Sequence, residues 1–323
     1  MHIPDGFLDA KTIAVASVLS AAGIGRALHN VRRTLTPRKV PLMGLASAFL
    51  FVAQMINFPV LGGTSGHLLG AVLAAILLGP DEAVLVMTVV LAVQAFLFAD
   101  GGVLALGANL FNMAIVAPLA GYAVFRLASR PARTEAGRLA AVAVAAWSSA
   151  VLAAIGCAGE LSLSGAVPWT LGFPAMTGIH MLIGLGEALI TVLVLAAIIE
   201  ARPDILPGLV VGRERAEETR PLKDVLIYGA VVVAGAVVFV LPLSSRLPDG
   251  LEATAARLGF ASRAAAPPAV PAPLAGYRVP GVGSLSLATA LAAGLGAILV
   301  FAVSFAIARR RSSRPKGGIP GNA

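Results

Sequence analysis

The chain has 323 residues, of which 58% are hydrophobic and only 12% are charged, and its mean hydropathy is +0.90. Soluble domains carry about 25% charged residues, so this composition excludes an ordinary soluble protein and indicates a membrane protein. Cys157 is the only cysteine, which excludes an internal disulfide and a thiolate cluster within one chain.

The N-terminus lacks the pattern of a signal peptide. It has no basic n-region, and Pro4, Asp5 and Asp9 interrupt any early apolar run. Because His2 is a bulky second residue, we expect Met1 to be retained once its formyl group has been removed. A free amine would then begin the mature chain.

Apolar segments predict nine membrane spans, at residues 11–28, 41–60, 64–79, 83–99, 103–126, 138–157, 176–200, 224–243 and 285–308. The third is short and begins with Gly62, Gly63 and Gly66, which suggests a loop that enters the membrane before the helix. We therefore expect an all-α polytopic membrane helix bundle, with about seven core spans and a C-terminal two-span hairpin.

Most of the 24 Lys and Arg residues follow spans one, five, seven and nine. They are Arg26, Arg32, Arg33, Arg38, Lys39, Arg126, Arg130, Arg133, Arg138, Arg202, Arg213, Arg215, Arg220, Lys223, Arg309, Arg310, Arg311, Arg314 and Lys316. By the positive-inside rule, the N-terminus is outside and the C-terminus is cytoplasmic. The net charge of +8 is thus a topology signal, and we expect membrane lipid and no nucleic acid as a partner.

The chain divides into two membrane units. Residues 1–203 form the first, 204–223 a charged cytoplasmic linker, and 224–323 a hairpin with a basic tail. The external loop of the hairpin, 244–283, begins with Pro248-Asp249-Gly250-Leu251-Glu252. Within it we expect a short interfacial helix over 251–260, and an extended, mobile segment over the Pro/Ala-rich run 264–275.

The first two residues predict a metal chelate. The Met1 amine, the His2 backbone nitrogen once deprotonated, and the His2 imidazole close a five-membered and then a six-membered ring. Three nitrogens in a plane leave one equatorial position open. Such tetragonal nitrogen surroundings suit Ni(II) and Cu(II), and some Co(II) sites are similar.

A histidine from elsewhere could fill the open position, and His67 is the candidate. It follows a stretch rich in small residues, in which Thr64 and Ser65 could hydrogen-bond an imidazole. An imidazole at a helix start inside a membrane needs a partner, so an interhelical hydrogen bond is the alternative. His29, beside Arg32 and Arg33, is interpreted as a solvated interfacial residue.

Further polar residues lie within the apolar spans: Gln54, Asn57, Gln94, Asp100, Asn109 and Asn112. Carboxamides bind nickel poorly, so these side chains would orient His67 and the N-terminal segment, or form ordinary helix–helix hydrogen bonds. In span seven, His180 and Glu187 are seven residues apart and share a face. They are either a second metal-binding position on an exit path for the metal or a pair that holds two helices together. We favour the helix interface.

Motifs of several enzyme classes are missing from the sequence. It contains no G-x-x-x-x-G-K-[ST], no H-E-x-x-H and no G-x-S-x-G. We therefore expect a transport component without ATPase or protease activity. A membrane enzyme that uses His67, His180 and Glu187 has no supporting motif.

Four motifs in order, Met1–Gly6, Gly63–His67, Gly107–Met113 and Gly184–Ala188, give residues 1–203 a resemblance to the CbiM/NikM family. This family comprises the substrate-binding components of cobalt and nickel energy-coupling-factor transporters. The tail from about 224 to 309 resembles the PDGLE-type partner component, here fused to the binding component. The resemblance implies a helical membrane bundle with an extended N-terminus that is tucked into the protein.

The resemblance also implies the metal site and the partners. The metal, Ni(II) or Co(II) as transported substrate, would be held by the Met1 amine, the backbone nitrogen and imidazole of His2, and His67. A transmembrane coupling component and two cytoplasmic ATPase subunits, on other chains, would drive uptake across a bacterial or archaeal cell membrane. The alternative function is a stand-alone secondary transporter or channel for metal. The sequence leaves nickel and cobalt unseparated.

Overall fold

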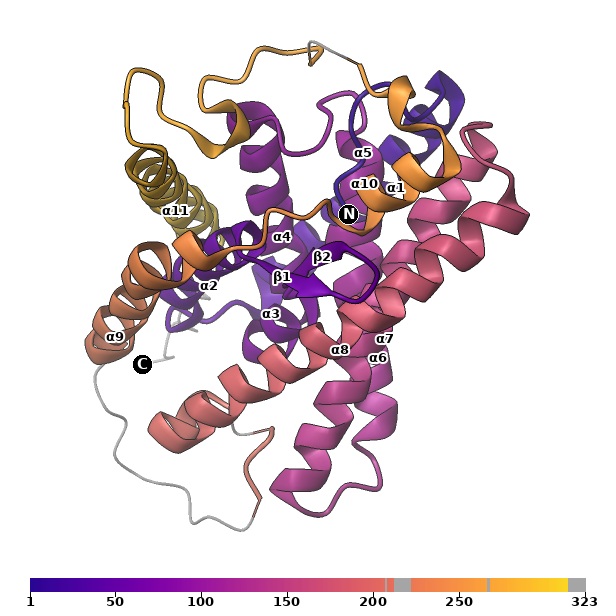
Figure 1. Cartoon of the computed structure of the whole chain (residues 1–323). Helices are drawn as coiled ribbons and strands as arrows, with labels where there is room; N and C mark the ends of the chain where they lie inside the picture. Colours follow the sequence, from indigo (N-terminus) through magenta and orange to yellow (C-terminus); the bar gives the residue numbers. More distant parts are fainter. Residues whose placement is uncertain (207, 212–221, 266–267, 313–323) are drawn as a thin grey trace, which may run out of the picture.

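The computed structural model describes residues 1–206, 208–211, 222–265 and 268–312, and it is built almost entirely of helices (Figure 1). Seven helices of the described residues are long and apolar enough to cross a membrane, at 10–34, 80–98, 106–128, 135–163, 169–201, 222–243 and 285–312. The predicted all-α membrane bundle is therefore confirmed, and the chain is a multi-pass membrane protein.

The helices are α1 (Ala10–Thr34), α2 (Lys39–Met55), α3 (Ala71–Leu78), α4 (Pro80–Val93), α5 (Leu106–Asn109), α6 (Ala117–Ala128), α7 (Glu135–Leu163), α8 (Trp169–Ala201), α9 (Leu222–Gly235), α10 (Gly250–Leu258) and α11 (Leu285–Ser312). The strands are β1 (Asn57–Val60) and β2 (Thr64–His67). Segments of π-helix continue α4 over Gln94–Phe98, join α5 to α6 over Leu110–Val116 and continue α9 over Ala236–Val240.

Two of the nine predicted spans, the second and the third, are not helices long enough to be counted among the seven membrane-spanning ones. α2 ends at Met55, and the chain then forms an antiparallel hairpin in which Asn57 lies opposite His67. Gly62 and Gly63 make its turn at φ +83° and +72°, which side-chain-bearing residues rarely adopt. α3 has only eight residues, about 12 Å of helix, which is too short for a hydrocarbon core of about 30 Å. The loop predicted before the third span is thus a β-hairpin.

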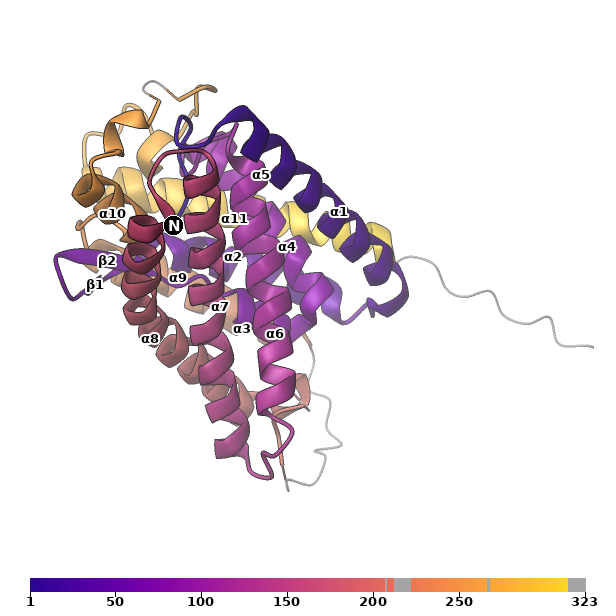
Figure 2. The same cartoon turned by 90° about the vertical axis from the view of Figure 1, so that its right-hand side faces the viewer.

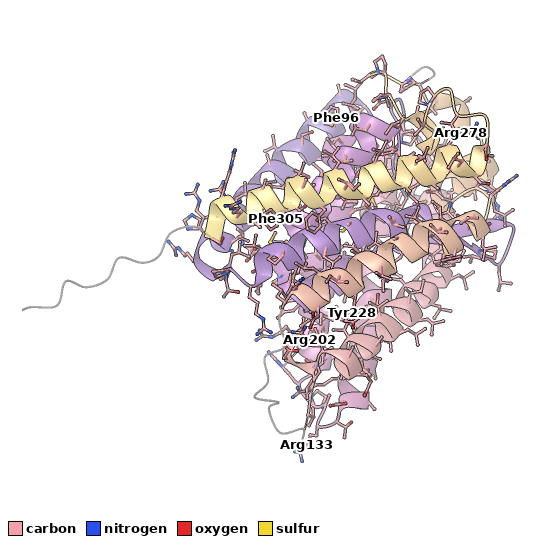
Figure 3. All side chains as sticks on the ribbon, turned by 90° about the vertical axis from the view of Figure 1, so that its left-hand side faces the viewer. Phe96, Arg133, Arg202, Tyr228, Arg278 and Phe305 are labelled. Atoms are coloured by element: carbon pink, nitrogen blue, oxygen red, sulfur yellow. The ribbon has the colours of Figure 1, made fainter. Side chains whose placement is uncertain are left out.

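The C-terminal helix packs on the first unit through small residues. α11 lies along α2, where the Ser47 hydroxyl donates to that of Ser304 at 2.6 Å. Gly296 faces the rings of Phe51 and Phe98, and a Cβ at this glycine would come within 2.9 Å of both. Figure 3 shows α11 running across the molecule, with Arg278 near one end and Phe305 towards the other. The two units therefore share one packed helical body.

Arg38 and Lys39, two residues of the predicted basic set, form ion pairs with acidic side chains. At one end, Arg38 pairs with Asp204 at 2.5 Å and Lys39 pairs with Glu82 at 2.9 Å. The opposite end holds the N-terminus, the β1–β2 hairpin and α10 (Figures 1 and 2). In the predicted linker, residues 207 and 212–221 lie outside the described residues. So do Arg213, Arg215, Arg220, Arg314 and Lys316 of the predicted basic set.

The predicted external loop is anchored to the first unit at several points. The interfacial helix expected over 251–260 is α10, Gly250–Leu258. The N–H of Ala265 donates to the Asp5 carbonyl at 2.7 Å, and the N–H of Leu274 donates to the Leu97 carbonyl at 2.8 Å. Both ends of the Pro/Ala-rich run are thus tied down, and its residues 266–267 lie outside the described residues.

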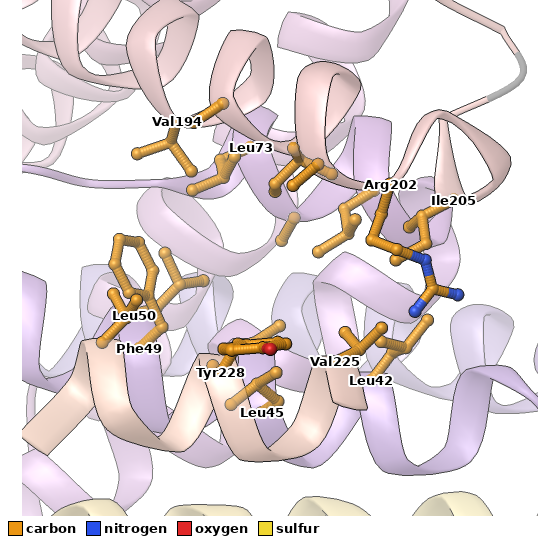
Figure 4. Close-up of a pocket in the computed structure, with 18 of the residues that line it drawn as sticks. Leu42, Leu45, Phe49, Leu50, Leu73, Val194, Arg202, Ile205, Val225 and Tyr228 are labelled. Atoms are coloured by element: carbon orange, nitrogen blue, oxygen red, sulfur yellow. The ribbon is translucent and has the colours of Figure 1, made fainter. Parts of the chain in front are cut away.

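An apolar cavity of about 610 Å³ lies between α2, α3, α8 and α9 (Figure 4). Leucine, alanine, valine and isoleucine side chains make most of its wall, with Arg202 and Asp224 among the polar exceptions. None of the residues that line it carries the N-terminal nitrogens described below. It separates α9 from helices of the first unit.

Candidate metal centre

The N-terminal segment is threaded into the bundle as extended chain. Ile3 is fully buried, and its N–H donates to Asn109 Oδ1 at 2.7 Å while Asn109 Nδ2 donates to the Ile3 carbonyl at 3.0 Å. The Gly102 N–H also donates to that carbonyl, at 2.8 Å. Asp5 Oδ1 accepts from the Leu104 N–H at 2.9 Å. The depth of the first two residues is therefore set by hydrogen bonds to residues 102–109.

This arrangement brings the predicted ligands together. The Met1 nitrogen lies 3.4 Å from His67 Nε2. The rings of His2 and His67 stack with centroids 5.4 Å apart and planes inclined by 29°. Adjacent ligand atoms around a metal, with bonds of about 2.1 Å, lie about 3 Å apart. His67 Nε2 therefore stands near the position beside the amine that the chelate leaves open.

The turn after β2 orients the His67 ring. His67 Nδ1 lies 3.2 Å from the Leu68 carbonyl oxygen, which can only accept, so Nδ1 carries the proton and Nε2 the lone pair. The buried Glu187 carboxylate accepts from the N–H groups of Leu69 and Gly70 at 2.6 and 2.8 Å. Glu187 therefore fixes the backbone immediately after the predicted ligand.

A relay of amides orients the His2 ring. Gln54 Nε2 donates to the Leu69 carbonyl at 3.0 Å, and Gln94 Nε2 donates to Gln54 Oε1 at 2.9 Å. Gln94 Oε1 then lies 3.2 Å from His2 Nε2, which must donate to it. The Leu69 carbonyl can only accept, so the Gln54 amide must turn its Nε2 towards it. This leaves Gln54 Oε1 as the acceptor and so fixes the orientation of the Gln94 amide. The lone pair of a neutral His2 is thus on Nδ1, the nitrogen that closes the six-membered ring.

Asp100 lies beside His2 Nδ1. Its Oδ1 is 3.3 Å from His2 Nδ1, and its Oδ2 accepts from the Tyr277 hydroxyl at 2.5 Å. Tyr277 belongs to the C-terminal unit and stacks on Phe98 with ring centroids 4.8 Å apart. The carboxylate favours a cation at His2 Nδ1, either a proton or a metal ion.

The run Pro248–Glu252 closes the site from the C-terminal unit. The Pro248 carbonyl accepts from the N–H of Ser65 at 2.8 Å and from the Thr64 hydroxyl at 3.0 Å. Asp249 Oδ2 accepts from the Met1 amine at 2.6 Å. A Cβ at Gly250 would lie 2.8 Å from His180 and 2.7 Å from Ile179, so only glycine lets this turn approach α8.

Burial and charge set the protonation of these groups. Burial works to lower the pKa of the Met1 amine, but the charge and hydrogen bond of Asp249 outweigh it, so this pKa lies above its usual value. Burial lowers the pKa of His2, and it lowers the pKa of His67 to about 3. Burial opposes ionisation of Asp249, yet the neighbouring ammonium group lowers its pKa. The site therefore holds an ammonium–carboxylate pair beside neutral imidazoles.

The structure distributes the remaining predicted residues over several roles. Gln54, Asn109 and Glu187 lie in the contacts just described. The hydroxyls of Thr64 and Ser65 bond to the carbonyls of Pro248 and Leu247 rather than to an imidazole. Asn57 uses its backbone, whose N–H donates to the Ser244 hydroxyl at 2.8 Å.

Two predicted residues bond away from the chelate. Asn112 donates to Glu160 on α7 at 2.6 Å. His180 Nδ1 lies 2.8 Å from the Met176 carbonyl of its own helix. His180 nevertheless lines a cavity of about 20 Å³ together with Met1, His67 and Asp249. Among the described residues His180 bonds to the Met176 carbonyl and Glu187 to the Leu69 and Gly70 N–H groups, and the role of the two as a pair at a helix interface stays a prediction.

Three residues of this region were not predicted from the sequence to take part in it: Asp249, Tyr277 and Glu160. Asp249 had a signal, since an acid followed three residues later by Glu252 is the pattern of a capping box. In the described part of the chain, no three His, Cys, Asp or Glu side chains are placed to hold a metal ion by themselves. A metal at this place therefore depends on the nitrogens of the N-terminus.

Comparison with known proteins places the chain in a family. Residues 2–205 match the model of the CbiM family, described as a cobalt uptake substrate-specific transmembrane region. Residues 223–311 match the PDGLE domain.

Two relatives and one solved structure illustrate the similarity. A protein of Archaeoglobus fulgidus, provisionally named a fused nickel transport protein NikMN, is 36% identical over 96% of this chain and 98% of its own length. The cobalt transport protein CbiM 1 of Pelobacter propionicus is 35% identical over 65% of this chain and 95% of its own length.

A crystal structure of a truncated transition metal transporter is 36% identical and superposes with a TM-score of 0.57, covering 62% of this chain and 99% of that one. The solved structure thus covers part of this chain, whereas the Archaeoglobus relative covers nearly all of it. The chain therefore belongs to the CbiM family of substrate-specific transmembrane proteins and carries a PDGLE domain in the same polypeptide.

Proposed function

We propose that this chain is the substrate-binding component of an importer for Ni(II) or Co(II). The metal would be bound by the Met1 amine, the His2 backbone nitrogen, His2 Nδ1 and His67 Nε2. The observation that carries the proposal is the 3.4 Å separation of the Met1 nitrogen and His67 Nε2, residues 66 positions apart. An all-nitrogen tetragonal set favours nickel over cobalt.

We assign separate roles to the two matched regions and to the segment between them. Residues 1–203 would bind the metal, residues 204–223 would link the units on the cytoplasmic side, and residues 224–323 would close the site. The N-terminus would face outward, because the positive-inside rule assigns the basic segments that follow predicted spans one, five, seven and nine to the cytoplasm. Metal would then enter from outside the cell membrane.

Energy for uptake would come from other chains. The sequence has no phosphate-binding Walker motif. From the resemblance to energy-coupling-factor transporters we infer a transmembrane coupling component and two cytoplasmic ATPase subunits on other chains. Their action would reorient the loaded component and release the metal. The alternative is transport by this chain alone.

Metal titration of the purified full chain with a native Met1 tests the binding site. We expect one Ni(II) per chain, and loss of that binding in His2→Ala and in His67→Ala. His29→Ala is the matched control, since His29 lies on α1 outside the site. Binding that is indifferent to His2 and His67 would place the metal elsewhere.

Uptake assays in proteoliposomes test the coupling. We expect no accumulation of metal by this chain alone, and ATP-dependent accumulation when the coupling component and ATPase subunits are added. Full uptake without those subunits would support the stand-alone transporter instead.

A further inference from the structure

The two oxygens of the Asp249 carboxylate have separate partners. Oδ1 accepts from the N–H groups of Leu251 and Glu252, both at 2.8 Å, and so caps α10. Oδ2 points away from the helix and accepts from the Met1 amine at 2.6 Å. The Glu252 side chain accepts from the Asp249 N–H at 3.0 Å and completes the capping box. The cap therefore fixes the direction in which Oδ2 projects.

The distances around the Met1 amine are those of neighbouring metal ligands. Asp249 Oδ2 lies 2.6 Å and His67 Nε2 lies 3.4 Å from this nitrogen. Both lie close to the separation of about 3 Å expected for adjacent ligand atoms. His67 and the chelate account for the four places of a nitrogen plane. An oxygen beside the amine would then occupy an axial place.

Charge balance provides an independent argument. In the metal-free site, the ammonium group of Met1 and the carboxylate of Asp249 neutralise each other. Chelation removes one proton from the amine and one from the His2 amide, and both go to solvent. The buried Asp249 carboxylate, which pairs with the Met1 ammonium group in the metal-free site, thereby loses its cationic partner. A buried carboxylate without such a partner is costly, and the bound metal is the cation that could replace the ammonium group.

We propose that Asp249 of the PDGLE domain is an oxygen ligand of the transported metal, bound through Oδ2 on the axial side of the nitrogen plane. This inference rests on the proposed function, because it assumes the chelate of Met1, His2 and His67. It gives the fused C-terminal unit a direct part in metal binding. The loaded site becomes five-coordinate.

Nickel reports its own coordination number. Ni(II) in a plane of four nitrogens is diamagnetic, whereas a fifth, axial ligand makes it paramagnetic. We would load the full chain, with native Met1, with Ni(II) in nanodiscs and measure its magnetic susceptibility by NMR together with its affinity. The variants are Asp249→Asn and Asp249→Ser, because Asn and Ser are both good N-caps and keep α10. Asp9→Asn is the matched control, since Asp9 caps α1 and does not touch the ligands.

The wild type and Asp9→Asn should bind paramagnetic Ni(II) with equal affinity. Both Asp249 variants should bind about 10- to 100-fold more weakly, and their nickel should be diamagnetic. Diamagnetic nickel in the wild type, or an unchanged magnetic state in the variants, would overturn the inference while leaving the nitrogen site intact. No binding by the wild type, or binding that survives His67→Ala, would instead overturn the proposed function.

Discussion

Asn109 holds Ile3 with both ends of its side-chain amide. Oδ1 accepts from the Ile3 N–H at 2.7 Å, and Nδ2 donates to the Ile3 carbonyl at 3.0 Å. This contact resembles one rung of a β-ladder, made by a side chain instead of a second strand. It fixes the residue that follows His2, so it determines the position of the Met1 and His2 nitrogens within the bundle.

Removing this contact should weaken metal binding. In Asn109→Ala, the buried N–H and carbonyl of Ile3 lose partners, and the N-terminal segment should dock less firmly. We expect Ni(II) affinity to fall about 10- to 100-fold, the range seen when groups that orient metal ligands are lost. Isothermal titration of the purified chain measures it.

Asn30→Ala is the control for Asn109→Ala, because Asn30 bonds to Asp81 at the opposite end of the bundle. It should leave the affinity unchanged. Equal affinities in all three proteins would show that Asn109 does not position the chelate.

Glu187 should be required for the turn that presents His67. In Glu187→Gln, one amide N–H would face the backbone N–H of Leu69 or Gly70, which leaves a buried donor without an acceptor. Such a loss costs about 1–3 kcal/mol, so thermal unfolding in detergent should begin at a lower temperature and Ni(II) affinity should fall. Glu252→Gln is the control, because Gln also serves in a capping box and should behave as wild type. An affinity in Glu187→Gln equal to wild type would separate this acid from the metal site.

The pH dependence of metal binding should come from the N-terminus and not from His67. The pKa of the Met1 amine lies above its usual value because of Asp249, so the amine is protonated at neutral pH and the metal must displace that proton. The pKa of His67 is lowered to about 3 by burial, so this ring is already neutral and releases nothing.

The sign of the effect follows from these two groups. Below the raised pKa of the amine, two protons are released per metal, and affinity should rise with pH by up to about 100-fold per pH unit. Above that pKa only the amide proton is released, and the rise should fall to about 10-fold per pH unit. Calorimetry in buffers of different ionisation enthalpy counts the protons directly. A count near zero would exclude both the amine and the amide as ligands.

How much of this site could be predicted depended on distance along the chain. Met1 and His2 are adjacent, so their chelate rings follow from covalent geometry alone, and His67 stood out as an imidazole in a glycine-rich apolar stretch. Asp249 is 248 residues from the amine that it contacts. Nothing in local periodicity shows that α10 packs beside β2, so its role required the tertiary structure.

The boundaries of α2 and α7 were mispredicted for related reasons. Residues 41–60 form one apolar run, and hydropathy does not distinguish the end of a helix from a half-buried strand such as Asn57–Val60. α7 continues to Leu163, beyond the predicted end at residue 157, and so includes Glu160. This acid lies buried against Asn112, a partner that only tertiary packing supplies.

The free amine of Met1 should be indispensable. Adding one residue before Met1 replaces the amine by an amide, moves His2 to the third position and places an extra residue against Asp249 and His67. A histidine at the third position can itself complete a four-nitrogen chelate, so we expect the dependence of Ni(II) binding on His67 to be lost while the helical circular dichroism spectrum is kept. An extension of the C-terminus by the same residue is the control. Ni(II) binding by the N-terminally extended protein that is still abolished by His67→Ala would contradict the proposed chelate.

Gly102 tests whether the docking of the N-terminal segment, rather than the ligands alone, determines binding. A Cβ at this position would lie 2.0 Å from Asp5 Oδ1 and 2.4 Å from the Asp5 backbone nitrogen, and the latter cannot move without the segment. Gly102→Ala should therefore displace residues 1–5 and reduce Ni(II) affinity at least about 10-fold, with every proposed ligand still present. Gly178→Ala is the matched control, because a Cβ there meets nothing within 4 Å. Titration of both variants distinguishes the two explanations. If Gly102→Ala binds as tightly as Gly178→Ala, the chelate forms without its docking contacts, and the hydrogen bonds of Asn109 and Asp5 would serve the fold alone.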